Sequence, residues 1–289
     1  MFEGVYTAIV TPFRDDGEVD YESLGRLIEW QISSGVAGIV PCGTTGESAT
    51  LSEAEHAEVI TFVVERVDKR AAVIAGTGSN CTKTAVELTR RAEKAGADGA
   101  LVISPYYNKP TPEGIYRHFL EISGSTSLPI VIYNVPGRTG SNIPPEVVER
   151  LSALENVTAV KEASGKLAQV SRMAANTDLD ILSGDDGLTL PILSVGGRGV
   201  ISVAGNVAPA WMSELTKSYL AGDVRRALAV HQKLRPLFEA LFIETNPIPV
   251  KTALAEMGKI NLYFRLPLVK MAESNRKELL KVLKELSLI

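Results

Sequence analysis

Lys161 stands in a sequence context that is unusual for a charged residue. It lies within VTAVKEA (Val157 to Ala163), a short apolar run typical of a buried strand, and lysine is almost never buried without a partner. Alternation along a strand puts Lys161 on the same side as Val157, Ala159 and Ala163. If that side faces a protein interior, loss of hydration lowers the pKa of the ammonium group, and the neutral amine can attack a carbonyl carbon.

Two neighbouring residues bear on this interpretation. Tyr133 stands at the equivalent height of the preceding strand run, where a phenol can pass protons to and from a lysine adduct, although a tyrosine in a strand is also an ordinary core residue. Arg138, in VPGRTG, carries a guanidinium suited to a substrate carboxylate, or is a surface loop arginine. The alternative for Lys161 is a side chain that reaches solvent or pairs with Glu162 or Glu47.

The segment GTTGES (Gly43 to Ser48) offers two hydroxyl groups and flexible backbone amides that can hold a carboxylate or relay a proton. It is not a phosphate-binding P-loop, because Glu47 stands where that motif has its lysine. The chain has two cysteines and three histidines, and the histidines lie far apart with no ligand spacing. We therefore expect a mechanism without a metal.

Eight short runs rich in valine and isoleucine recur along the chain, with helical patterns between them. They are Val5 to Val10, Gly38 to Cys42, Ala72 to Thr77, Gly99 to Ser104, Pro129 to Val135, Val157 to Ala163, Asp180 to Asp185 and Gly199 to Gly205. Such runs are typical of parallel strands covered on both faces. The alternation predicts a (β/α)₈ barrel, an α/β fold. The alternative is a doubly wound open sheet, but VTPFRDDGE in the first turn has no nucleotide-binding fingerprint.

Helix signals occupy the intervening segments. Asp20 precedes an amphipathic stripe, Ser52 and Glu55 form a capping box, Thr111 precedes a proline at a first helical position, and Gly96 ends a helix. After residue 207 the strand signals stop and four helical segments follow, more than one barrel helix requires. We expect a catalytic barrel over residues 1–223 and a C-terminal helical domain over residues 224–289.

Composition limits the classes of partner. The chain has 289 residues and a formal net charge of −4, which argues against a surface built for nucleic acid. No apolar run approaches the roughly 18 residues that span a bilayer, and the first residues, MFEGVYT, do not resemble a signal peptide. We expect a cytoplasmic protein without a membrane partner.

Seven motifs together resemble one family. They are GTTGES (Gly43 to Ser48), PYYNKPTPEG (Pro105 to Gly114), YNVPGRTG (Tyr133 to Gly140), VKEASG (Val160 to Gly165), LSGDD (Leu182 to Asp186), GVISV (Gly199 to Val203) and NPIPVK (Asn246 to Lys251). In this combination the sequence resembles the 4-hydroxy-tetrahydrodipicolinate synthases, formerly dihydrodipicolinate synthases, within the pyruvate-dependent aldolase and lyase superfamily. The resemblance covers essentially the whole chain.

The resemblance implies an enzyme of lysine and diaminopimelate biosynthesis that condenses pyruvate with L-aspartate 4-semialdehyde. Lys161 would form a Schiff base with pyruvate, and Tyr133 would donate and accept protons. Thr44 would link Tyr133 to Tyr107, which in this family reaches across from a neighbouring subunit. Since the family is usually a tetramer of tight dimers, the resemblance implies a homotetramer.

The resemblance also implies the residues around the substrates. Thr45 would neighbour pyruvate, Arg138 would hold the carboxylate of the semialdehyde, and the backbones of Gly184 and Ile201 would bracket Lys161. The protonated Schiff base accepts the electron pair released from the pyruvate methyl group, so we expect no metal and no organic cofactor.

Regulation by lysine is where the sequence departs from the family pattern. The residues that resemble the lysine site of inhibited members are Ser48, Ala49, His56, Asn80 and Tyr106. However, Glu53 and Thr84 stand where such members usually carry histidine and glutamate. Without an acid at position 84 the pocket has less to hold the ammonium group of lysine, so we expect weak or absent feedback.

Two other functions stay open at this point. A related Schiff-base aldolase, such as N-acetylneuraminate lyase or a 2-keto-3-deoxy sugar acid aldolase, would share the first step but use another aldehyde. Such relatives generally lack an arginine at the position of Arg138. The second alternative is a non-catalytic barrel that binds small acids.

Overall fold

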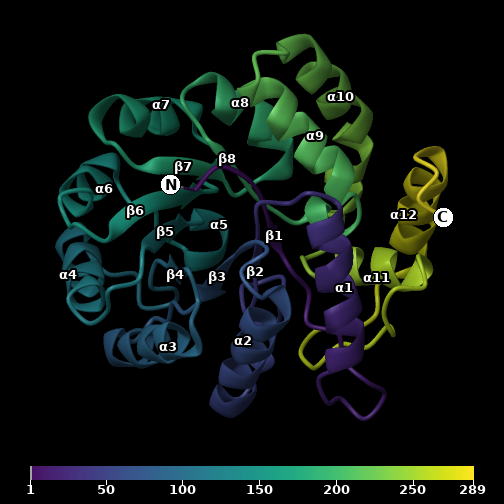
Figure 1. Ribbon diagram of the computed structural model, residues 1–289, viewed down its shortest axis with the longest axis horizontal. Coiled ribbons are helices and arrows are strands. Elements are labelled where there is room, and N and C mark those ends of the chain that lie inside the picture. The colour runs from purple at the N-terminus through teal and green to yellow at the C-terminus, as the bar shows by residue number, and fades with distance from the viewer. Residues whose placement is uncertain (1) are drawn as a thin grey trace.

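A closed barrel of parallel strands, ordered β1 to β8 as in the sequence, forms the centre of the computed structural model, which describes residues 2–289 (Figure 1). The strands are β1 Gly4–Ala8, β2 Gly38–Val40, β3 Ala72–Gly76, β4 Gly99–Ile103, β5 Ile130–Asn134, β6 Val157–Glu162, β7 Asp180–Ser183 and β8 Gly199–Ser202. This architecture confirms the predicted (β/α)₈ barrel. Met1, the first residue of the predicted barrel segment, lies outside the described residues.

Every predicted strand run overlaps a strand, but the runs continue past the strand ends. The run that ends at Cys42 holds β2 only as far as Val40, and Cys42 itself adopts a left-handed conformation with φ 55°. Cys42 is 3% exposed, so the chain stays apolar after it leaves the sheet. Apolar composition therefore marks burial at the end of the barrel as well as strand.

Helices follow the strands and form the outer layer. They are α1 Tyr21–Ser33, α2 Glu53–Val67, α3 Thr82–Ala95, α4 Pro112–Ser123, the short α5 Pro136–Thr139, α6 Pro145–Leu151, α7 Leu167–Asn176, α8 Thr189–Ser194 and α9 Pro209–Leu220. The Asp20 cap and the reciprocal capping box of Ser52 and Glu55 are present, and Gly96 ends α3 with φ 88°. These confirmed caps fix where the loops between strands and helices begin and end.

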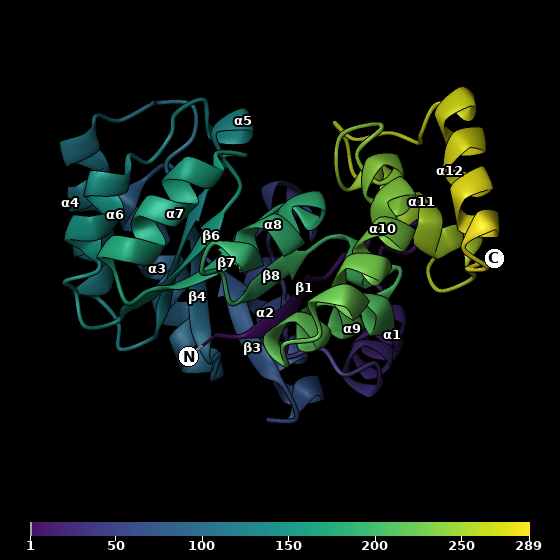
Figure 2. The same ribbon diagram turned by 90° about the horizontal axis from the view of Figure 1, so that it is seen from above.

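Three helices follow the barrel: α10 Val224–Ala240, α11 Ile248–Glu256 and α12 Glu273–Glu285. Helix α10 packs on α9 and α12, and α12 also packs on α11. Figure 2 shows α11 and α12, in yellow-green and yellow, gathered at one side of the barrel. The loop between α10 and α11 is the part of this segment that reaches the site described below.

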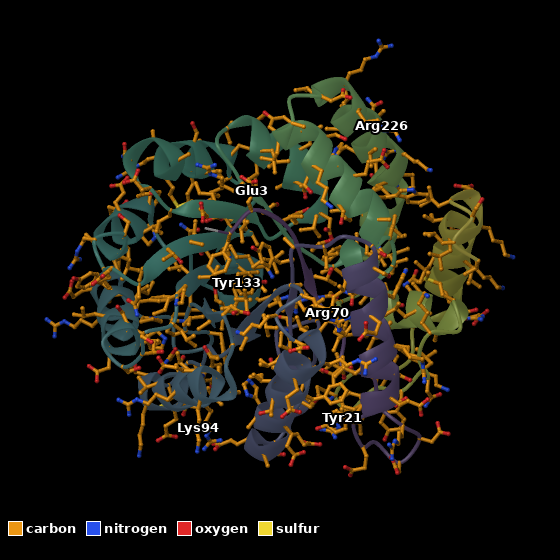
Figure 3. All side chains as sticks on the ribbon, viewed as in Figure 1. Glu3, Tyr21, Arg70, Lys94, Tyr133 and Arg226 are labelled. Atoms are coloured by element: carbon orange, nitrogen blue, oxygen red, sulfur yellow. The ribbon has the colours of Figure 1, made fainter. Side chains whose placement is uncertain are left out.

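Two apolar layers hold the structure together. One lies between strands and helices, and the other fills the barrel with residues that include Tyr6, Leu101, Tyr133 and Ile201. Tyr133 lies inside the ring of strands in Figure 3, whereas Lys94 and Arg226 lie at the periphery.

One detail of the alternation in β6 is corrected. Ala159 belongs to the barrel interior with Ala163 packed against it, but Val157 packs in the outer layer. The cause is a register shift at the start of the strand, where Ile130 pairs with Val157 but Val131 pairs with Ala159. The inward alternation therefore begins at Ala159 and still includes Lys161.

Candidate active site

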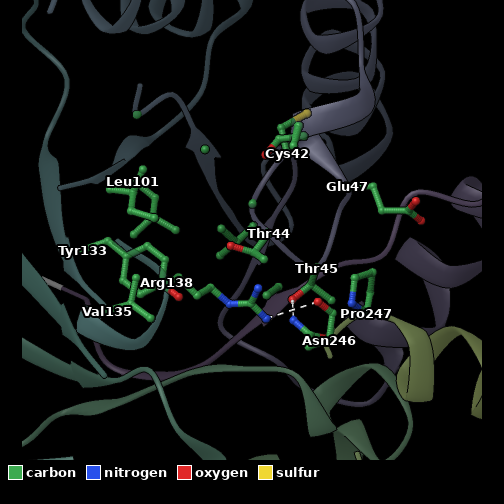
Figure 4. Close-up of a pocket in the computed structure, with 18 of the residues that line it drawn as sticks. Cys42, Thr44, Thr45, Glu47, Leu101, Tyr133, Val135, Arg138, Asn246 and Pro247 are labelled. Carbon is green, nitrogen blue, oxygen red and sulfur yellow. Dashed lines mark hydrogen bonds between the residues drawn. The ribbon is translucent and has the colours of Figure 1, made fainter. Parts of the chain in front are cut away.

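A cavity of about 730 Å³ opens where the barrel strands end. This is the end of a (β/α)₈ barrel at which reactive groups gather. Its lining brings together most residues singled out in the sequence: Thr44 and Thr45 after β2, Tyr133 in β5, Arg138 in α5, Lys161 in β6 and Gly184 after β7. Figure 4 shows Thr44, Thr45, Tyr133 and Arg138 around this cavity.

Lys161 is buried at the floor of this cavity, with 6% of its surface exposed. Its Nζ lies 4.1 Å from the centre of the Tyr133 ring, and the two residues are paired in the register of β5 and β6. Burial lowers the pKa of the Lys161 ammonium from 10.5 to about 7, against the attraction of Asp186 and with the repulsion of Arg138. A substantial fraction of this amine is therefore a free nucleophile near neutral pH.

Tyr133 is the proton-carrying group nearest to that amine. Burial raises the pKa of its phenol to about 12, while the charge of Arg138 and a hydrogen bond with the Thr44 side chain act in the opposite direction. The phenol is therefore protonated near neutral pH and can donate its proton to an oxygen that develops negative charge.

Gly184 leaves room for the lysine side chain. A Cβ at this position would lie 2.7 Å from the Cβ of Ala163 and 3.2 Å from Cε of Lys161. A larger residue would push Lys161 out of its position, so glycine is required by the packing here.

Asp186, beyond Gly184, is a buried carboxylate of the site that the sequence did not single out. It accepts hydrogen bonds from the Ser202 hydroxyl at 2.5 Å and from the backbone N–H groups of Val203 at 3.0 Å and Ala204 at 2.8 Å. Burial raises its pKa to about 6, and these three hydrogen bonds oppose that shift. Its charge raises the pKa of Lys161 and so opposes the lowering of that pKa by burial.

The C-terminal segment closes one side of the cavity through Asn246. The guanidinium of Arg138 donates to the Asn246 carbonyl at 3.2 Å, and the Asn246 amide donates to the Thr45 hydroxyl at 3.0 Å (Figure 4). Asn246 is 5% exposed. One residue from outside the barrel therefore holds the predicted carboxylate-binding arginine and one hydroxyl of the GTTGES segment.

A buried ion pair holds Glu47 of the GTTGES segment. Glu47 accepts from Nζ of Lys251 in α11 at 2.5 Å, and both side chains are fully buried. Glu47 has a left-handed backbone with φ 54°, and residues other than glycine adopt this conformation at a cost in free energy. The alternative that Lys161 pairs with Glu47 or Glu162 is wrong. Glu47 is paired with Lys251, and Glu162 accepts hydrogen bonds only from neutral groups.

Within residues 2–289, no group of three or more histidine, cysteine, aspartate or glutamate side chains is placed to hold a metal ion. Over the same residues, no helix combines the length and the apolar character that crossing a membrane requires.

The comparisons with known proteins agree on one family. A sequence model of the dihydrodipicolinate synthetase family matches residues 1–286. The chain belongs to that family. It is 55% identical over 286 residues to a 4-hydroxy-tetrahydrodipicolinate synthase of Nitratidesulfovibrio vulgaris (strain DP4), with 98% of each chain covered. It is 54% identical over 291 residues to the synthase of Syntrophus aciditrophicus, with both chains fully covered. The crystal structure of dihydrodipicolinate synthase from Aquifex aeolicus superposes with a TM-score of 0.98 at 48% identity, covering 99% of both chains.

Two predicted residues of the synthetase family's site do not line the cavity in the single chain. Ile201 is a residue of β8 that is 1% exposed inside the barrel. Tyr107 is 89% exposed, with a left-handed φ of 73°.

The residues that resemble a lysine site are mostly close together. Ser48, Ala49, His56 and Tyr106 line the same cavity, and Asn80 does not; Thr84, which departs from the family pattern, also lines it. Nε2 of His56 lies 2.8 Å from the Gly76 carbonyl, and burial lowers the pKa of this imidazole. Glu53 forms an exposed ion pair with Arg91 at 3.0 Å. Nothing in this arrangement supplies an acid at the position of Thr84.

Sequence reasoning missed Asn246 and Lys251 as site residues, although both stand in the NPIPVK motif. Lys251 carried the same signal as Lys161, a lysine within an apolar segment (IPVKTALA). Asn246 carried no such signal, because its role depends on Thr45 and Arg138, more than a hundred residues away.

Proposed function

We propose that this chain condenses pyruvate with L-aspartate 4-semialdehyde to give 4-hydroxy-tetrahydrodipicolinate, the first committed step of lysine and diaminopimelate biosynthesis. Lys161 is the nucleophile of this reaction. The observation that carries the proposal is the buried Lys161 amine, with its pKa near 7 and the Tyr133 ring 4.1 Å away, in the cavity of a member of this family. A buried lysine of this kind is a Schiff-base nucleophile.

In the first step the neutral amine of Lys161 adds to the keto carbon of pyruvate. The Tyr133 phenol protonates the keto oxygen, takes one proton from the nitrogen and passes it to the same oxygen, which leaves as water, so that the protonated imine forms with Tyr133 as the phenolate. Thr44, whose side chain lowers the pKa of the Tyr133 phenol, orients that phenol. The Tyr133 phenolate then takes a proton from the methyl group, and the electron pair of that C–H bond moves toward the protonated imine, which yields the carbon nucleophile.

In the second step that carbon attacks the aldehyde carbon of the semialdehyde and forms the new C–C bond, while the Tyr133 phenol protonates the aldehyde oxygen to a hydroxyl group. Arg138 binds the semialdehyde carboxylate at the mouth of the site, and Thr45 lies beside the pyruvate moiety. The neutral amine of the semialdehyde then attacks the imine carbon and closes the ring, and one of its protons passes to the nitrogen of Lys161, which leaves as the free amine. Gly184 and Ile201 bracket Lys161 with their backbones throughout.

Tyr107 acts from a neighbouring subunit and completes the proton path with Tyr133 and Thr44. Its exposure in the single chain supports this role, since a side chain that is 89% exposed is available to a partner. This role requires at least a dimer, and the usual assembly of the family extends the proposal to a homotetramer. The proposed location is the cytoplasm. A fully active monomer would contradict this role of Tyr107.

The remaining proposals concern organisation and control. The barrel of residues 1–223 carries the nucleophile, and the helical domain of residues 224–289 supplies Asn246 and Lys251 to the site. Lysine inhibits weakly or not at all, because Thr84 offers no charge to the ammonium group of the inhibitor. Inhibition at sub-millimolar lysine would contradict that proposal.

Borohydride reduction in the presence of pyruvate tests the nucleophile. We expect a pyruvate-derived adduct on Lys161 in the peptide mass spectrum and none in Lys161→Ala. Absence of the adduct in the wild-type protein would overturn every Schiff-base function, including the sugar acid aldolases. Turnover of pyruvate with aspartate semialdehyde is then compared with sugar aldehydes, and a preference for the sugars would overturn the choice of second substrate.

A further inference from the structure

Behind the two reacting side chains lies a second, separate polar cluster. Asn134 follows Tyr133 in β5, and Glu162 follows Lys161 in β6. Asn134 and Glu162 are paired in the register of the two strands. Successive side chains of a strand point to opposite faces, so Asn134 and Glu162 lie on the outer face of the barrel wall. Both are buried, at 0% and 1% exposure.

The Glu162 carboxylate receives hydrogen bonds on both oxygens. Asn134 Nδ2 lies 3.2 Å from Oε1 and 3.0 Å from Oε2, the backbone N–H of Ser164 donates to Oε1 at 2.7 Å, and Gln169 Nε2 in α7 donates to Oε2 at 3.2 Å. Within residues 2–289, no lysine or arginine forms an ion pair with Glu162. A buried carboxylate held only by neutral donors is costly to keep, which calls for a reason beyond packing.

The geometry requires an acceptor at this position. The backbone N–H of Ile143 donates to Asn134 Oδ1 at 3.0 Å, and this contact orients the Asn134 amide so that its NH₂ group faces Glu162. The N–H of Ser164 can also only donate. A glutamine in place of Glu162 would put an NH₂ group against these donors or against Gln169, and no amide rotation removes the conflict without creating another.

The cluster continues to the segment that carries Arg138. Asn142, three residues after α5, accepts from Asn134 Nδ2 at 3.0 Å and donates to Gln169 Oε1 at 3.0 Å. The polar cluster of Asn134, Asn142, Glu162 and Gln169 therefore touches the strand of Tyr133, the strand of Lys161 and the loop that follows Arg138. Figure 1 shows α7, which contributes Gln169, outside β6 and β7.

We propose that Glu162 is a positioning residue. The cluster that it anchors fixes Tyr133, Lys161 and the loop that follows Arg138 (the Arg138 loop) relative to one another. The inference rests on the proposed function and adds residues that touch neither substrate. Misplacement of reacting groups by about 1 Å can lower the rate about a hundredfold. Hydrogen bonds that connect the two strands carrying these groups therefore have a direct kinetic effect. Within the cluster, Glu162 connects the strands of Tyr133 and Lys161, whereas Asn142 connects the cluster to the loop that follows Arg138. Loss of each connection therefore predicts a different kinetic effect.

The test measures the rate of borohydride-trapped adduct formation at saturating pyruvate, and the KM for aspartate semialdehyde, in three variants. Glu162→Gln keeps the shape and introduces the donor conflict between β5 and β6, so we expect adduct formation to slow by about tenfold or more. Asn142→Ala loosens the Arg138 loop, so we expect the KM for the semialdehyde to rise by about tenfold while adduct formation stays within about twofold of wild type.

Asn156→Ala is the matched control for a loss of stability alone. Asn156 precedes β6 at the opposite end of the strand from Lys161, and its side chain bonds Ser123 at 2.5 and 3.1 Å and the Thr126 carbonyl at 3.0 Å. We expect this variant to melt at lower temperature with both kinetic quantities unchanged.

Adduct formation at the wild-type rate in Glu162→Gln, or slowed only as much as in Asn156→Ala, would overturn the proposal, as would an unchanged KM in Asn142→Ala. If Glu162→Gln does not fold, Gln169→Met, which removes one donor and keeps the carboxylate, is held to the same criterion. Absence of any adduct in the wild-type protein would instead refute the proposed function itself.

Discussion

The buried pair of Lys251 and Glu47 provides the sharpest test of how the C-terminal helices serve the site. Lys251→Met keeps the length and apolar stem of the side chain but removes its charge. Glu47 then stays fully buried without a cation, and its Oε2 already lacks a hydrogen-bond partner. Breaking a buried ion pair from one side costs about 3–5 kcal/mol, because the remaining charge is uncompensated. We expect a loss of this size in the free energy of unfolding.

The measurement is urea unfolding followed by tryptophan fluorescence, at one fixed protein concentration because any assembly contributes to stability. Two matched variants sharpen it. Glu47→Gln combined with Lys251→Met removes both charges, and we expect it to recover most of the loss. Arg26→Ala breaks an exposed pair with Glu22 and is expected to cost about 1 kcal/mol or less.

Turnover is measured in the same proteins. Glu47 ends the segment that carries Thr44 and Thr45, and its left-handed backbone is held in place by the bond to Lys251. We expect Lys251→Met to lower kcat, because an unanchored segment no longer holds its hydroxyls in place. A stability loss below about 1 kcal/mol, or a double variant no more stable than Lys251→Met, would refute this reasoning about the buried pair.

Three further predictions concern the reacting groups. Because the pKa of Lys161 is about 7, about half of the amine is neutral at pH 7 and about one-tenth at pH 6, so adduct formation should slow about fivefold between them; a pH-independent rate would contradict this. Tyr133→Phe should retain the trapped adduct while kcat falls about a hundredfold or more, since the proton carrier is lost; wild-type kcat would exclude that role. Asn246→Ala should raise the KM for pyruvate several-fold, because Thr45 loses its hydrogen-bond donor; an unchanged KM would show that Thr45 is held by other contacts.

The barrel and most of the cavity could be predicted from the sequence because both depend on local patterns. A short apolar run predicts each strand, and the caps at Asp20, Ser52 and Gly96 are local hydrogen-bonding motifs. Once strands are parallel and closed into a barrel, residues at their carboxyl ends must meet, so Lys161 and Tyr133 follow from fold and position.

The strand ends and the bulge in β6 could not be predicted in the same way. Composition reports burial, and the loops after the strands are also buried, so the apolar run of β2 continues to Cys42. The register shift opposite Ile130 depends on how two strands pair, and neither strand alone encodes it. Both errors leave the position of Lys161 unchanged, because the shift occurs before Ala159.

The missed residues share a different property: each acquires its role from a partner far along the chain. Lys251 is separated from Glu47 by 204 residues and Asn246 from Thr45 by 201. The sequence does signal that a charge within an apolar segment needs a partner, for Lys251 and for Glu162 as much as for Lys161. It does not say which of the three is a nucleophile, and the structure separates them by their surroundings. Lys251 is paired with a carboxylate, and Glu162 accepts from three neutral donor groups, whereas Lys161 faces a cavity with no anion hydrogen-bonded to it among residues 2–289. A buried charge whose bonding capacity is left free toward a cavity is the one available for chemistry.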